Sequence, residues 1–138
     1  MKIAYTYILL LLFSGCSYKG VLKRNKKSFV TVADYLVNSG KSKICAEDVK
    51  DNPSIKSKMK RLRMEGVVLN NFNSGYPNEP ADSAVVFINQ NLFKYKKVIY
   101  DYSKILKLYP DTTIEHKNYS FKHINKRFYY SIHDQWAD

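Results

Sequence analysis

The apolar run over residues 3–13 is the feature that most limits how this chain can fold. Lys2 precedes the run, and the small residues Ser14 and Gly15 follow it. A helix needs about 20 apolar residues to cross a bilayer, so the run is too short to span one. Its length and its flanks are typical of a cleavable signal peptide. We therefore expect residues 1–15 to be removed and the folded domain to be built from the rest of the chain.

The segment LFSGC, residues 12–16, resembles the lipobox of bacterial lipoproteins. That family has an aliphatic residue, a small residue, Gly or Ala, and then Cys; Phe13 stands where Leu is usual. The resemblance covers residues 1–16 and implies that Cys16 receives diacylglycerol on its thiol, becomes the first residue of the mature protein and carries acyl chains such as palmitate. Ser17, which is not Asp, resembles the default for sorting to the outer membrane in cells with two membranes.

The residues that follow the cysteine are strongly basic. We expect residues 16–28 to form a solvated tether, which either holds the domain off the membrane or contacts anionic headgroups at about 1 kcal/mol per basic residue near the surface. Residues 29–138 are expected to form a single domain with one modest core. The basic residues of the tether are Lys19, Lys23, Arg24, Lys26 and Lys27.

The first helix of the domain is predicted over residues 29–38 (FVTVADYLVN). Apolar side chains recur there at steps of three and four residues, which is the spacing of an amphipathic helix. Thr31 is expected to cap the start of this helix, and Gly40 is expected to lie just past its end. The helix would then follow the tether directly.

A second helix is predicted over residues 54–65. The dipeptide Asn52-Pro53 places a capping residue before a proline at the first helical position. Gly66 is the expected residue just past the end of the helix. Its apolar face is expected to consist of Ile55, Met59 and Leu62.

Short β-branched and aromatic runs predict strands, mainly in the second half of the chain. Residues 95–109 repeat apolar side chains at helical spacing and predict a helix that Pro110 ends. The same register extends back to Ser83, so one long helix from there is an alternative to a strand over 84–89. The expected fold class is α+β, with two or three helices packed on a mainly C-terminal sheet. The predicted strands are residues 67–72, 84–89, 112–116 and 128–133, with a loop over 73–82 and a turn at 90–91.

Few groups in the chain are able to perform chemistry. His116, His133 and Asp134 would hold a metal only if the fold brought them together, and their spacing matches no zinc motif. Cys45 would act as a nucleophile only beside a histidine. Otherwise we expect it to be a small buried hydrophobe, or a disulfide partner of Cys16 if that residue is not lipidated. We therefore expect no enzyme activity, no metal site and no cofactor apart from the covalent lipid on Cys16.

The formal net charge of +11 favours acidic partners: anionic headgroups, polyanionic envelope polymers or nucleic acid. Residues 32–69 loosely resemble a winged helix-turn-helix, which would place Lys58, Arg61 and Arg63 on DNA. An exported protein does not meet the chromosome, so we expect a nucleic-acid partner only if the signal peptide is not one. The candidate face for an anionic partner consists of Lys56, Lys58, Lys60, Arg61 and Arg63.

The C-terminal segment interleaves aromatic and basic residues, and Trp136 is its candidate exposed anchor for a partner. We expect a non-enzymatic accessory or binding factor of the cell envelope, held in the outer membrane where two membranes exist. Its partner would be another envelope protein or an anionic polymer. A toxin-immunity or exclusion lipoprotein, which also acts by binding, is the alternative. A hydrolase of envelope polymers is a further alternative, and it would need His116, His133 or Cys45.

Overall fold

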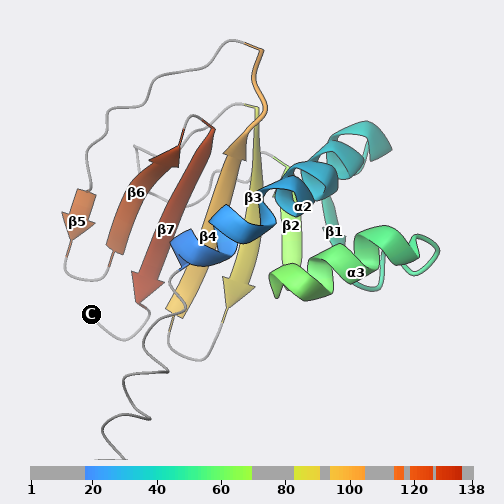
Figure 1. Cartoon of the computed structure of the whole chain (residues 1–138), viewed down its shortest axis with the longest axis horizontal. Helices are drawn as coiled ribbons and strands as arrows, with labels where there is room; N and C mark the ends of the chain where they lie inside the picture. The colour runs from blue at the N-terminus through green and yellow to red at the C-terminus, as the bar shows by residue number, and fades with distance from the viewer. Residues whose placement is uncertain are drawn as a thin grey trace, which may run out of the picture.

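The computed structural model of the chain describes residues 18–69, 83–90, 94–104, 114–116, 119–125 and 127–134. Within these ranges, two helices lie against one face of an antiparallel sheet (Figure 1). The predicted α+β fold class is confirmed. The elements are α2 (Tyr18–Ser39), β1 (Lys43–Cys45), α3 (Pro53–Leu62), β2 (Gly66–Leu69), β3 (Ala84–Gln90), β4 (Lys94–Asp101), β5 (Ile114–His116), β6 (Tyr119–Asn125) and β7 (Phe128–Asp134). They form a seven-stranded sheet in the order β1-β2-β3-β4-β7-β6-β5.

The helix α2 begins well before residue 29, where the helix was predicted to start, and the predicted cap at Thr31 is wrong. The first residue of α2 is Tyr18, and the Thr31 hydroxyl donates a hydrogen bond to the Lys27 carbonyl inside the helix, at 2.8 Å. Leu22 is only 1% exposed, because it lies two helical turns before Phe29 on the same face. The predicted solvated tether is therefore wrong for residues 18–28, which belong to a packed helix of the domain.

The predicted helix over residues 29–38 is confirmed as the second half of α2. Phe29 is fully buried and makes edge-to-face ring contacts with Phe87 of β3 and Phe128 of β7, with centroids 4.8 and 6.2 Å apart. Gly40 has φ +70° and ends the helix as predicted. Asn25, on the stripe between Leu22 and Phe29, donates to the Val21 carbonyl at 2.9 Å, but its buried Oδ1 has no partner among the described residues.

The helix α3 begins where the sequence predicted. The Asn52 side chain accepts a hydrogen bond from the Ile55 amide at 3.2 Å, and Pro53 is the first helical residue. The predicted end at Gly66 is wrong: Arg63 adopts the left-handed conformation, with φ 55°, and its amide donates to the Lys60 carbonyl at 3.0 Å. Gly66 instead begins β2. The predicted apolar face is confirmed, because Ile55, Met59 and Leu62 are all buried.

The predicted helix over residues 95–109 is wrong, and so is the alternative of one long helix from Ser83. Residues 94–101 form β4, between β3 and β7, and residues 105–109 lie outside the described part of the chain. Val98 faces the helices while its neighbour Ile99 faces the opposite side, and both are buried. A strand buried on both faces has adjacent apolar residues, which imitate helical spacing.

The sheet carries a separate apolar cluster on each face. Toward the helices, Val67, Val85, Phe87, Val98 and Phe128 join the main core. On the opposite face, Phe121 of β6 stacks on Tyr129 of β7, with ring centroids 5.6 Å apart. The central strands are therefore apolar on both sides.

Two of the four predicted strands lie wholly within the described residues. The strand over 84–89 is confirmed as β3, and that over 128–133 as β7. The strands over 67–72 and 112–116 are confirmed in their described parts, as β2 and β5. The loop over 73–82 lies outside the described residues, as does Asn91 of the predicted turn. The strand β6 was not predicted.

An arginine ties the end of β4 to the turn before β7. Arg127 Nη1 donates to the carbonyl oxygens of Asp101, at 3.1 Å, and Ser103, at 2.8 Å. The Asp101 amide donates to the Arg127 carbonyl at 2.8 Å, and the Asp101 carboxylate accepts from the Ser103 amide at 2.8 Å. These bonds satisfy polar groups around Asp101, which is 1% exposed.

Candidate anion-binding face

The first turn of α2 lies very close to the cysteine predicted to carry lipid. Cys16, the signal peptide over 1–15 and Ser17 lie outside the described residues, but α2 begins at Tyr18. Two residues of chain span at most about 7 Å even when fully extended. Because α2 is packed into the core through Leu22, a lipid on Cys16 would hold the folded domain itself, not a long tether, next to the bilayer.

The exposed side of α2 is basic along its first half. Lys23, Arg24, Lys26 and Lys27 are all exposed, and the Arg24 guanidinium donates to the Gly20 carbonyl at 3.4 Å. The helix contains five basic residues, and its one acidic residue is Asp34, in the second half. The first half of α2 therefore carries several positively charged side chains on consecutive turns.

The helix α3 adds the residues predicted from the sequence. Lys56, Lys60, Arg61 and Arg63 are exposed, and Lys58 is half-buried. The Lys58 ammonium donates to the Ser54 hydroxyl at 2.9 Å. The helix contains four basic residues and no acidic one. The Asn89 side-chain amide of β3 donates to the Arg63 carbonyl, and so fastens the end of α3 to the sheet.

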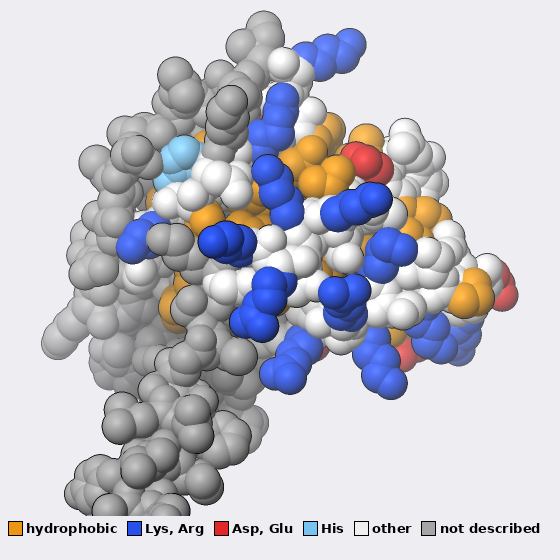
Figure 2. Space-filling model, in the orientation of Figure 1, with side chains coloured by type: hydrophobic (Ala, Val, Ile, Leu, Met, Phe, Trp, Pro, Cys, Tyr) orange, Lys and Arg blue, Asp and Glu red, His pale blue; other side chains and the backbone are white. Residues whose placement is uncertain are grey.

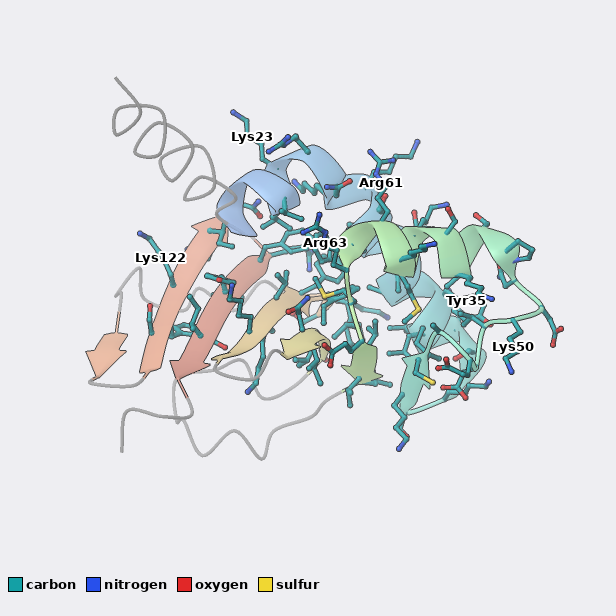
Figure 3. The ribbon with its side chains drawn as sticks, turned by 90° about the horizontal axis from the view of Figure 1, so that it is seen from below. Lys23, Tyr35, Lys50, Arg61, Arg63 and Lys122 are labelled. Carbon is teal, nitrogen blue, oxygen red and sulfur yellow. The ribbon has the colours of Figure 1, made fainter. Side chains whose placement is uncertain are left out.

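The two helices present these charges on one side of the molecule. Figure 2 shows Lys and Arg side chains spread over the face that carries the helices, with few acidic side chains among them. Lys23 of α2, Arg61 of α3 and Lys122 of β6 all extend to the helix side of the sheet, whereas Lys50, in the loop before α3, extends in the opposite direction (Figure 3). We call the exposed side of α2 and α3, together with Lys122, the cationic face.

About half of the cationic face was not predicted as such from the sequence. The α3 residues were predicted as a face for an anionic partner. The α2 residues were placed in the tether, and Lys122 was placed in the C-terminal segment that interleaves aromatic and basic residues. The apolar register of Leu22 and Phe29 was the signal that α2 starts earlier, because the two are seven residues apart.

Cys45 lies far across the sheet from both histidines that were considered as its partners. Cys45 lies on the edge strand β1, while His116 lies on β5 at the opposite edge. His133 on β7 is four strand spacings from β1, about 19 Å. Cys45 is therefore too far from either histidine for the two to act as nucleophile and base.

The strand register relates the three residues that were weighed as a metal site. His116 and His133 both pair with Tyr119, so they are two strand spacings apart, about 9.6 Å. Asp134 pairs with Lys94 at the next position of β7. Among the residues that the structure describes, no group of three metal-binding side chains occurs.

Cys45 has an environment that disfavours its thiolate. It is half-buried, and its amide donates to the Asp48 carboxylate at 2.7 Å. A hydrogen bond from the thiol to that same carboxylate raises the pKa of Cys45, because the negative oxygen favours the protonated sulfur. The pKa of Asp48 is lowered by the same contact. A thiol of raised pKa is a poor nucleophile at neutral pH.

The winged helix-turn-helix that residues 32–69 loosely resemble is not the observed fold. The strand β1 and a turn lie between α2 and α3, and β2 and β3 belong to the continuous sheet rather than to a two-stranded wing. Trp136 lies outside the described residues.

In the described part of the chain, no helix is long and apolar enough to cross a membrane. Comparison with protein-family models, with curated proteins and with solved structures found no match for this chain.

Proposed function

We propose that this protein is a bacterial lipoprotein of the cell envelope, anchored through lipid on Cys16, whose folded domain acts by binding rather than by catalysis. The observation that carries the proposal is the apolar run ending in the segment LFSGC. A diacylated or triacylated cysteine holds a protein stably on a bilayer, which a single acyl chain does not.

The folded domain supports a binding role. Cys45 and the histidines are separated across the sheet, while both helices display basic side chains to solvent. The partner of such a domain is another envelope protein or an anionic envelope component, and the outer membrane is the proposed site where a cell has two membranes.

Labelling with a palmitate analogue tests the anchor. The wild-type protein should incorporate the label and partition with membranes, Cys16→Ala should do neither, and Cys45→Ala should behave as wild type. Equal incorporation by wild type and Cys16→Ala would refute the proposal.

A further inference from the structure

The proposed anchor lies very close in the chain to the helices. Only Ser17 separates Cys16 from α2, and Leu22 fixes the first turns of α2 in the core. If Cys16 carries lipid, as proposed above, the start of α2 is held within about 7 Å of the anchored residue. That distance is shorter than the Debye length of about 8 Å at physiological ionic strength, so charges on the first turns act on the headgroups with little screening.

Basic side chains of both helices extend to one side of the molecule. Lys23 of α2 and Arg61 of α3 extend to the same side of the molecule as Lys122 of β6 (Figure 3). Glu47, Asp48 and Asp51 precede α3 in the segment that carries Lys50, which extends in the opposite direction to Lys23 and Arg61, while Glu65 follows α3 and Asp34 lies in the second half of α2. Among the described residues, the two helices therefore carry many more basic than acidic side chains, and a negative plane attracts the side on which they lie.

We propose that the cationic face is a docking surface for anionic phospholipid headgroups, so that the lipid on Cys16 and the two helices together hold the domain with its helices against the membrane. The opposite face of the sheet then points away from the bilayer. Each basic residue close to an anionic membrane strengthens binding about fivefold. Several such residues on two helices select one orientation of the anchored domain.

The occupant is a membrane rather than a nucleic acid because the anchor brings only the membrane to this face. The charges also lie on two helices and a strand, a broad surface suited to a plane, and no described wing accompanies α3.

Protection of lysines from an amine-reactive reagent tests the orientation. The membrane-extracted protein is placed in vesicles of phosphatidylcholine alone or with 30 mol% phosphatidylglycerol, and modification is read by mass spectrometry. In the anionic vesicles we expect Lys23 and Lys60 to react at least about fivefold more slowly than in neutral ones, and Lys50 to react equally in both. High salt should abolish the difference.

Two variants, each replacing one lysine by glutamate, complete the test, and the second is the control for the change in charge. Lys60→Glu should lower the salt concentration at which protection of Lys23 is half lost, whereas Lys50→Glu should leave it unchanged. Protein that floats with the vesicles but shows equal labelling of all three lysines would overturn the docking surface and leave the anchor standing. So would protection of Lys23 and Lys60 by an oligonucleotide but not by anionic vesicles. Protein that floats with neither vesicle would overturn the anchor and the docking surface together.

Discussion

Replacing Leu22 by alanine tests whether the first turns of α2 belong to the folded domain. The side chain is 1% exposed, and full burial of a leucine stabilises a protein by about 1.5–3 kcal/mol. The cavity left by alanine raises the loss for Leu→Ala to about 2–5 kcal/mol in well-packed cores. The end of a helix relaxes more easily than its centre, so we expect a loss of about 2–3 kcal/mol. Total stabilities of about 5–15 kcal/mol make that loss easy to measure.

The assay is urea unfolding followed by far-UV circular dichroism, on chains that all carry Cys16→Ser so that none is lipidated. Lys23→Ala is the matched control, because it changes the next, exposed residue and should alter the unfolding free energy by less than about 0.5 kcal/mol. If residues 18–28 were a solvated tether, both variants would unfold at the wild-type urea concentration, and that result would refute the packed helix.

Three further predictions concern single side chains. Asn52→Ala removes the cap that accepts from the Ile55 amide, and should lower the unfolding free energy by about 1 kcal/mol in the same assay. Asn25→Ala removes a buried oxygen that has no hydrogen-bond partner among the described residues and raises helix propensity, so it should stabilise the domain by about 1 kcal/mol. A loss of stability would show that Oδ1 has a partner. Asp48→Asn should lower the pKa of Cys45 toward its ordinary value and move the pH profile of thiol alkylation to lower pH. In the wild type, the raised thiol pKa stabilises the fold at pH values below the ordinary thiol pKa, and this stabilisation is lost as pH rises through the raised pKa. The variant should therefore lose less stability than the wild type over that pH range.

The sequence predicted best those elements whose signals are local. The cap at Asn52, the proline after it and the apolar face of α3 lie within one short segment, so no distant contact was needed to identify the helix. The turn to positive φ at Arg63 could not be predicted, because glycine is the usual residue there and Gly66 lay nearby.

The strand β4 was mistaken for a helix because its environment is set by the fold. Val98 is covered by the helices, and Ile99 packs with Phe121 and Tyr129 on the other face. Apolar residues at neighbouring positions then lose the alternation that identifies a half-exposed strand. Only knowledge that β4 lies at the centre of the sheet would have corrected this prediction.

Only the part of the candidate site on α3 was predicted from the sequence. The α3 residues were identified because the helix itself was. The basic residues of α2 were assigned to a tether because that segment is strongly basic, and the apolar register that begins at Phe29 was not extended back to Leu22. The separation of Cys45 from His116 depends on strand order, which no local pattern in the sequence reveals.

The intact mass of the membrane-extracted protein, compared with that of Cys16→Ala, tests the proposed anchor most directly. We predict a wild-type mass that lacks residues 1–15 and includes diacylglycerol or a further acyl chain, and we predict that Cys16→Ala loses the lipid mass. An unmodified full-length mass in the soluble fraction would contradict the lipoprotein assignment, and with it the membrane as the partner of the cationic face.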